Sequence, residues 1–152
     1  MQFTGVTLNK KVTPVNYKKG VENMSELAKK ISEAELAVLE VLWQAGEPLT
    51  VTPIRIRLCE EWGWDASTVK TLLRRLCDKG AVAAEKREVF YYRPLLSREE
   101  YQSWSTSSLV NRVYKGSARD LVASLVAQKQ LTQADLEELR GILYPQEGSD
   151  DE

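Results

Sequence analysis

The stretch Ser67-Thr68-Val69-Lys70-Thr71-Leu72-Leu73-Arg74-Arg75-Leu76 decides how the rest of the sequence is interpreted. Asp65 or Ser67 is placed to cap the start of a helix here, and Gly80 ends it. Four apolar residues recur at the i, i+3, i+4, i+7 spacing of a helix with one buried face: Val69, Leu72, Leu73 and Leu76. The stretch is therefore predicted to be an amphipathic helix packed on a core.

The opposite face of this helix carries short polar side chains and three cations, with only Asp78 near its end. Its residues are Ser67, Thr68, Lys70, Thr71, Arg74 and Arg75. A DNA-recognition helix needs this division, because one face packs on its own domain while the other enters the major groove. Arginine can bind guanine there with two hydrogen bonds. A face that is merely solvated would look similar, so that alternative stays open.

Two further helices are predicted upstream. The first begins at the capping box Ser32-Glu33-Ala34-Glu35 and ends at Gly46 and Pro48. The second begins at Thr52, with Pro53 in the first helical position, and ends at Gly63. Their apolar stripes, which we expect in the core, are Leu36, Leu39, Leu42 and Trp43 in the first helix and Ile54, Leu58 and Trp62 in the second.

Residues 81–93 change to the pattern of a β-hairpin. Val82 and Ala84 alternate with other residues, and Val89-Phe90-Tyr91-Tyr92 favours a strand, with the charged tip Glu85-Lys86-Arg87-Glu88 between them. Three helices and a hairpin predict a winged helix-turn-helix domain. Lys86 and Arg87 are candidates for contact with phosphate or the minor groove, although a solvated turn fits equally well. The aromatic residues Phe90, Tyr91 and Tyr92 are expected in the core or on the sheet surface, and stacking on nucleic acid is the alternative.

Three short amphipathic helices are predicted after Pro94, beginning at Ser97, Ser117 and Thr132. Together they bury little apolar surface alone, so they need either a symmetry mate or the winged-helix domain as a partner. We favour a two-fold dimer. The residues assigned to dimerisation are Tyr101, Trp104, Leu109, Val113, Leu121, Leu125, Leu136 and Leu139.

The expected fold is mainly α with a small β-hairpin wing, and it falls into four segments. Residues 1–24 form a disordered basic extension, 25–96 the winged-helix domain, 97–145 the helical dimerisation domain and 146–152 an acidic tail. The extension supplies charge for DNA binding, or it precedes a natural start at Met24, because Lys19-Gly20-Val21 can be encoded by a sequence resembling a ribosome-binding site.

The lack of histidine and the small number of cysteines exclude several kinds of catalytic and metal site. The 152 residues include no histidine and only two cysteines, so histidine-based catalysis, histidine-containing zinc sites and four-cysteine metal sites are excluded. Neither GxxxxGK[ST] nor GxGxxG occurs. We expect a binding protein without a metal or other cofactor. No signal-peptide core or long apolar run is present, which predicts a cytoplasmic protein without membrane insertion.

The net charge of −1 hides an uneven distribution along the chain. Residues 1–30 carry a charge of +4, residues 31–96 carry −1 and residues 97–152 carry −4. Near-neutrality is therefore no argument against DNA binding. Cys59 and Cys77 lie on the second and third helices of one domain, where buried, reduced thiols are expected and a redox switch is the alternative.

The region from Ile31 to Leu143 resembles the penicillinase repressor family. The likeness is carried by Ile31-Ser32-Glu33-Ala34-Glu35 with Val38, Leu42 and Trp43, by residues 67–76, by Phe90-Tyr91-Tyr92, by Val113-Tyr114-Lys115-Gly116, by Leu131-Thr132 and by Glu137-Glu138-Leu139-Arg140. This resemblance implies a homodimeric transcriptional repressor that binds a palindromic operator and dimerises through its C-terminal helices. Thr68, Lys70, Thr71 and Arg75 match the groove-facing residues of the family, whereas Ser67 and Arg74 stand at exposed positions where the family varies.

The resemblance also implies how repression is relieved. In the antibiotic-resistance members, a membrane sensor-protease that detects β-lactam triggers a cut at an Asn–Phe bond in the dimer domain. Ser124-Leu125 stands at that place here, so the protease specificity would differ. The copper-responsive branch has a cysteine-rich C-terminal motif, and this chain has no cysteine after Cys77. The alternatives are a family repressor that responds to another signal and a winged-helix module that docks a protein.

Overall fold

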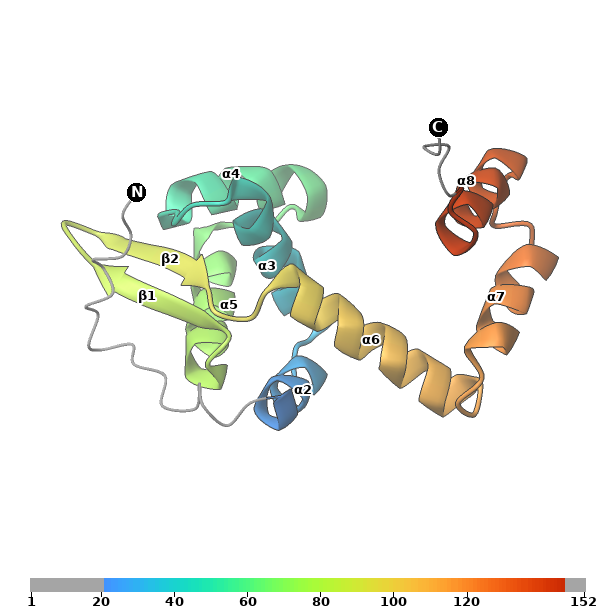
Figure 1. The fold of residues 1–152 in the computed structure, drawn as a ribbon. Coiled ribbons are helices and arrows are strands. Elements are labelled where there is room, and N and C mark those ends of the chain that lie inside the picture. The colour runs from blue at the N-terminus through green and yellow to red at the C-terminus, as the bar shows by residue number, and fades with distance from the viewer. Residues whose placement is uncertain (1–20, 147–152) are drawn as a thin grey trace, which may run out of the picture. The chain divides into compact units, whose positions relative to one another are not determined.

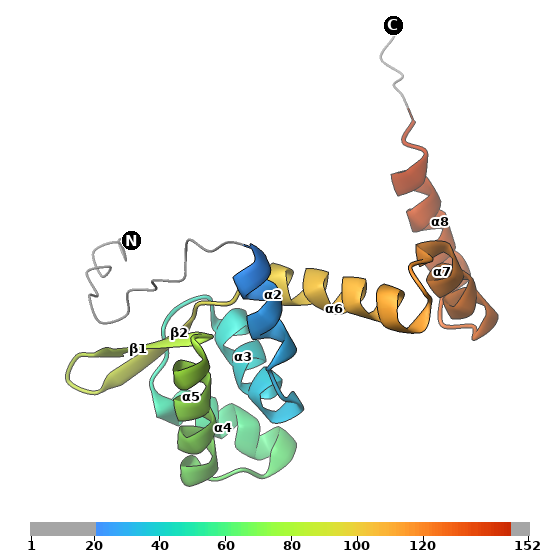
Figure 2. The same cartoon turned by 90° about the horizontal axis from the view of Figure 1, so that it is seen from below.

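The computed structural model describes residues 21–146, which form seven helices and one two-stranded sheet (Figures 1 and 2). The described part of the chain divides into two compact units, the first ending at Ser105 and the second beginning at Thr106. Residues 1–20 of the expected extension and residues 147–152 of the expected acidic tail lie outside the described residues.

Helix α2 (Val21–Lys29) opens the described chain and was not expected from the sequence. Its first four residues fall in the segment predicted to be a disordered extension, so that prediction is wrong for residues 21–24. The helix forms because Met24, Leu27, Ala28 and Ile31 follow helical spacing. Ala28 and Ile31 are buried, and Met24 and Leu27 pack against the core. The apolar periodicity was therefore present, but the basic residues around it concealed it.

Helix α3 (Glu33–Ala45) begins as predicted, with the Ser32 hydroxyl accepting from the Glu35 N–H and the Glu35 carboxylate accepting from the Ser32 N–H. Helix α4 (Val51–Trp62) begins after Thr50, two residues before the expected start. Pro53 is thus its third residue, which is tolerated because the first N–H groups of a helix have no intrahelical partner. Both helices end at a glycine with positive φ, Gly46 at 70° and Gly63 at 72°.

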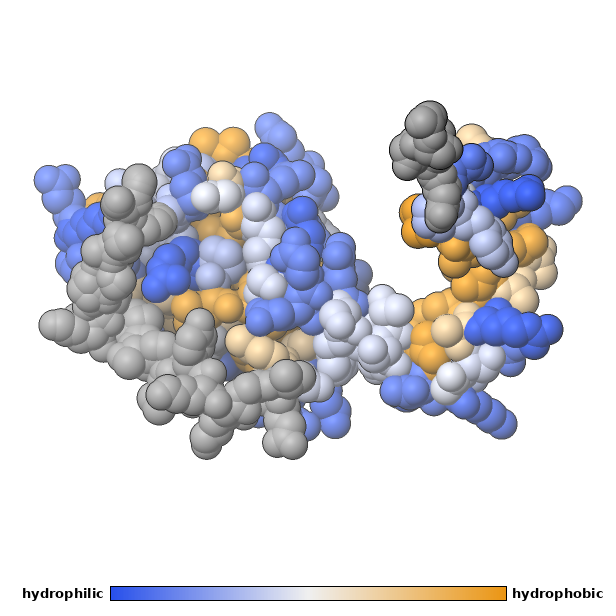
Figure 3. Space-filling view, viewed as in Figure 1, coloured by the Kyte–Doolittle hydropathy of each residue, from blue (hydrophilic) through white to orange (hydrophobic). Residues whose placement is uncertain are grey.

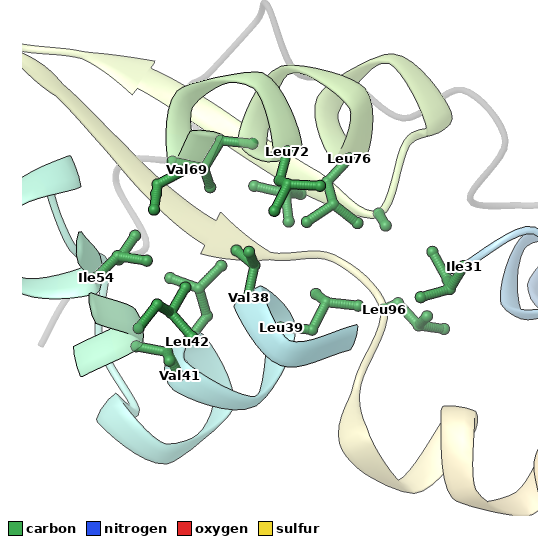
Figure 4. Packing of buried hydrophobic residues seen from close by; sticks show 14 residues of the cluster. Ile31, Val38, Leu39, Val41, Leu42, Ile54, Val69, Leu72, Leu76 and Leu96 are labelled. Carbon is green, nitrogen blue, oxygen red and sulfur yellow. The ribbon is translucent and has the colours of Figure 1, made fainter. Parts of the chain in front are cut away.

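Helix α5 (Ala66–Lys79) occupies the stretch that the apolar spacing indicated. Asp65, rather than Ser67, caps it, because its carboxylate accepts from the Thr68 N–H at 2.9 Å. The side chains of α3, α4 and α5 converge on one apolar core, joined by Ile31 before α3 and Leu96 after the sheet (Figure 4). The predicted packing faces of α3 and α5 are therefore largely confirmed.

Trp62 is a correction to the expected core of α4. Ile54 and Leu58 are buried as expected, but Trp62 is 44% exposed and lies against Trp64, with ring centroids 4.8 Å apart. As the last residue before Gly63, it lies one turn beyond the buried stripe. Trp64, in the turn that follows, packs against the core instead.

Strands β1 (Val82–Lys86) and β2 (Phe90–Pro94) form the predicted antiparallel hairpin. Its register pairs Lys86 with Phe90, so the tip is shorter than the four charged residues expected. Leu49 adds a single bridge to Tyr92, with backbone hydrogen bonds of 2.8 and 3.0 Å in the two directions. This bridge ties the hairpin to the segment between α3 and α4.

The boundary between the two units lies within helix α6 (Arg98–Val113). The first turn of α6 contacts side chains of α3 in the first unit. The capping box of Ser97 and Glu100 forms as predicted. Arg98 forms an ion pair with Glu40 at 2.9 Å, and its guanidinium lies 5.6 Å from the centre of the Trp43 ring. The Trp43 indole N–H in turn donates to the Leu96 carbonyl at 2.8 Å.

The second unit contains the end of α6 together with α7 (Ala118–Ala127) and α8 (Gln133–Leu143). Ser117 caps α7, and Thr132 caps α8 with a full capping box formed with Asp135. No residue of α6, α7 or α8, all of them described, is buried. Apolar surface gathers on these helices (Figure 3).

Candidate nucleic-acid interface

Helix α5 separates its packing face from its polar face as a recognition helix requires. Val69, Leu72, Leu73 and Leu76 are buried in the core. The structure places the predicted DNA-binding residues on the remaining surface, with Ser67, Lys70, Arg74 and Arg75 exposed and Thr68 and Thr71 half-buried. Because the core fixes the rotation of α5, these side chains form one continuous polar face, here called the α5 face.

The three cations of the α5 face are uncompensated within the described chain. Lys79, Arg87, Arg98 and Arg119 all have a carboxylate within 4 Å. Lys70, Arg74 and Arg75 have no such partner among residues 21–146. Exposed cations without an internal counter-ion are suited to neutralise phosphate and release the ions condensed on DNA.

Asp65 restricts where an anion can approach α5. Its carboxylate also accepts from the Ser67 hydroxyl at 3.2 Å, and these bonds, with the Thr68 N–H first, hold the pKa of Asp65 below its usual value. A charged carboxylate therefore occupies the N-terminus of the helix, where a phosphate would otherwise bind. The attractive part of the α5 face begins one turn later, at Lys70.

The wing holds its two cations against aromatic rings. The Lys86 ammonium lies 4.8 Å from the centre of the Phe90 ring, and the Arg87 guanidinium lies 4.4 Å from that of Tyr91. Tyr92 packs on the core, and burial, followed by Cys77, raises its pKa. Phe90 and Tyr91 were expected as core or sheet residues, with stacking on nucleic acid as the alternative, so their contact with the cations was missed. The hairpin register would have revealed it, since Lys86 and Phe90 are direct cross-strand partners.

The residues assigned to dimerisation fall into two groups. Leu109, Val113, Leu136 and Leu139 are exposed in the second unit, and Leu121 and Leu125 there are half-buried. Tyr101 and Trp104 belong to the first unit, where Tyr101 packs against the core, with its ring centroid 6.2 Å from Trp43 and 5.7 Å from Trp104. Tyr101 thus has an intramolecular packing role that the sequence did not indicate.

A sequence profile described as "Penicillinase repressor" matches residues 31–144, about three quarters of the chain. The chain belongs to the penicillinase repressor family. It is a DNA-binding transcriptional repressor and not an enzyme, and its α5 and hairpin supply the winged helix.

Individual relatives share much of this repressor's length. The methicillin resistance regulatory protein MecI of Mammaliicoccus sciuri is 31% identical over 114 residues, which cover 74% of this chain and 92% of the relative. The penicillinase repressor of Bacillus licheniformis is 33% identical over 114 residues, covering 74% and 88%. Among solved structures, hsRosR-S4 matches with a TM-score of 0.46 and 19% identity, covering 70% of this chain and 96% of that one.

The predicted cleavage position of this repressor lies inside a helix. Ser124 and Leu125 are both half-buried in α7. The Tyr114 hydroxyl donates to the Ser124 Oγ at 3.1 Å, and the Gln128 side-chain amide donates to the same atom at 2.9 Å. The Tyr114 bond ties the turn after α6 to the middle of α7, and the Gln128 bond lies within the last turn of α7.

The two cysteines of the repressor differ in environment. Cys59 is exposed, so the expectation that both thiols are buried is wrong for this residue. It lies on α4 immediately after Leu58, where the helix turns its other side to solvent. Cys77 is half-buried, and desolvation, assisted by Asp78, raises its pKa to about 11.

The described residues contain no cluster of three or more histidine, cysteine, aspartate or glutamate side chains suited to hold a metal ion. Among the helices of residues 21–146, none has the length and apolar character needed to cross a membrane.

Proposed function

We propose that this repressor binds a palindromic operator as a homodimer, with the α5 helix of each protomer in successive major grooves roughly 34 Å apart. The observation that carries the proposal is the α5 face, where three exposed cations have no counter-ion in the described chain. Thr68, Lys70, Thr71 and Arg75 would supply the principal contacts, with Ser67 and Arg74 beside them. Lys86 and Arg87 would extend the contact to the wing.

The second unit supports the dimer part of the proposal. Its three helices bury no residue by themselves and expose leucine and valine side chains. Monomeric proteins rarely leave contiguous apolar surface of this kind uncovered. A second copy of the same helices would cover it by two-fold symmetry, and dimerisation would join two half-site contacts into one binding event.

Relief of repression by proteolysis is the third part of the proposal. Relatives of this chain are named for methicillin resistance and penicillinase, which supports a β-lactam resistance gene as the target. The family resemblance implies a membrane sensor-protease as the partner. The cut would fall between Ser124 and Leu125 and would separate Leu121 from the remaining dimerisation residues of α7 and α8. An unrelated inducing signal is the alternative.

A mobility-shift assay on the duplex upstream of the protein's own gene tests DNA binding. We expect Lys70→Ala and Arg75→Ala each to weaken binding and to lower its dependence on salt, because each removes a cation facing phosphate or base. Lys29→Ala, which removes an exposed cation from α2, is the matched control. Unchanged binding in both α5 variants at equal salt would favour a protein-docking role for the winged helix instead.

A further inference from the structure

The two cations of the wing, Lys86 and Arg87, lie on opposite faces of the hairpin and have different neighbours. Side chains alternate across a strand, so the register places Lys86 with its partner Phe90 on one face and Glu85 with its partner Tyr91 on the other. Arg87, two residues after Glu85, extends over that second face. At the tip of the hairpin, Lys86 therefore lies against Phe90 on one face, whereas Arg87 lies against Tyr91 and beside the Glu85 carboxylate on the other.

Arg87 is neutralised within the wing. Its Nε and Nη2 atoms donate to the same Glu85 carboxylate oxygen at 3.1 and 2.7 Å, while Tyr91 lies beneath the guanidinium. Binding to phosphate would require Arg87 to leave this carboxylate or to share it. The charge that Arg87 can offer to DNA is therefore largely cancelled by its neighbour.

Lys86 is held in place without being neutralised. No carboxylate of the described residues lies within 4 Å of its ammonium. The Phe90 ring beneath it lies 6.4 Å from Tyr92, and Tyr92 is fixed by the core and by its bridge to Leu49. A chain of contacts thus runs from the core to an exposed, free positive charge.

We propose that Lys86 is the phosphate-binding cation of the wing, that Phe90 is its positioning residue, and that Glu85 removes Arg87 from this role. The inference rests on the proposed function, since it concerns the same DNA-binding surface. It assigns different roles to Lys86 and Arg87, although the sequence predicts both equally as candidates for contact with DNA.

The salt dependence of binding distinguishes these roles. Each phosphate neutralised contributes about 0.9 to the slope of log K against log salt concentration on duplex DNA. We expect Lys86→Gln to lower the slope by about 0.9 for each wing bound and Arg87→Gln to leave it nearly unchanged. Glu85→Gln should raise the slope, because it frees Arg87. The upstream duplex is the probe, and a random-sequence duplex of equal length reports the non-specific component.

Phe90 is tested through Lys86. A cation–π contact at an exposed site corresponds to about a two- to fivefold effect, so Phe90→Leu should weaken binding by that factor for each wing. Phe90→Tyr should restore it, because the ring is kept. In the Lys86→Gln background, Phe90→Leu should have no further effect. A fold defect would appear in all backgrounds and in the thermal unfolding midpoint.

Several outcomes would overturn this inference. Equal loss of slope in Lys86→Gln and Arg87→Gln would show that both cations bind phosphate. An effect of Phe90→Leu that persists without Lys86 would show that the ring itself contacts DNA. If Lys70→Ala weakens binding while Lys86→Gln does not, the wing inference fails and the proposed function stands. If Lys70→Ala, Arg75→Ala and Lys86→Gln all leave binding unchanged, the proposed function fails as well.

Discussion

Glu35 joins local capping to long-range packing. It is the buried charged residue of the described core, and its carboxylate accepts from the Ser32 N–H and from the Lys79 ammonium at 2.6 Å. Lys79 also donates to the Lys30 carbonyl at 2.7 Å. One carboxylate therefore connects the start of α3 with the last turn of α5, the helix that carries the three cations of the α5 face.

The lowered pKa of Glu35 makes the contribution of this contact to the unfolding free energy depend on pH. Burial raises the pKa, but the hydrogen bonds from Lys79 and Ser32, together with the Lys79 charge, outweigh burial and lower it overall. The contact thus stabilises the fold above the unfolded-state pKa of about 4.3 and is lost as pH falls through the lower folded pKa. We expect Glu35→Gln to flatten the fall in unfolding free energy between about pH 5 and pH 3. Parallel curves for variant and wild type would contradict this role.

Removal of the cation is the complementary change. Lys79→Met leaves Glu35 buried without its strongest partner, which should lower the unfolding free energy at neutral pH by about 1–3 kcal/mol. Lys30→Met removes an exposed cation and keeps the carbonyl, so it serves as the control. Urea denaturation of both variants measures the difference.

The cysteines give a prediction about reactivity. With a pKa of about 11, about one Cys77 thiol in a thousand is ionised at pH 8, and the thiolate is the reactive form. We expect a thiol-specific disulfide reagent to modify exposed Cys59 in the native protein and Cys77 only on unfolding. The Cys59→Ser variant should then show no fast phase. A fast reaction in that variant would show that Cys77 is accessible and reopen a redox role.

At the scale of elements, α7 must open before a protease can cut at Ser124. Cleavage inside a helix follows the population of a locally unfolded state. The hydrogen bond from Tyr114 to Ser124 lowers that population. Tyr114→Phe removes a bond worth about 1 kcal/mol, so cleavage in α7 should become about fivefold faster.

Limited proteolysis with mass-spectrometric mapping of the fragments measures this rate. Tyr144→Phe is the matched control, because Tyr144 is strongly exposed and its hydroxyl has no hydrogen-bond partner in the described residues. Equal rates for the two variants would mean that the Tyr114 bond does not hold α7 closed.

At the scale of the whole molecule, a single added charge tests the proposed dimer separately from folding. Leu139→Glu puts a carboxylate on the exposed apolar stripe of α8, where a symmetry mate would have to bury it. We expect this variant to sediment as a monomer and to bind the upstream duplex weakly. Gln133→Glu adds the same charge to the same helix at an exposed, non-apolar position and should remain dimeric. A dimeric Leu139→Glu variant would place the interface elsewhere.

Local patterns predicted most of the fold, because caps, stop signals and apolar periods act within a few residues. They predicted α5, the hairpin and the order of the helices. They did not predict α2, whose short apolar stripe lies among lysines, or the exposure of Trp62, which depends on where α4 stops. The Glu35–Lys79 contact spans 44 residues and follows from packing alone. The α5 face could be predicted as a polar surface, whereas its lack of counter-ions required the structure.

The α5 face also contains a repulsion between like charges that lowers the stability of the helix. Lys70 and Arg74 are four residues apart on one helix, and such like-charged pairs destabilise a helix by about 0.2–0.5 kcal/mol. A protein shaped only for stability would place a glutamate at one of the two positions. We therefore expect Lys70→Gln to raise the thermal midpoint slightly at low salt while weakening DNA binding, with the gain in midpoint vanishing at high salt. The phosphates of bound DNA would offset this repulsion, so that the folded repressor is more stable when it is bound to DNA.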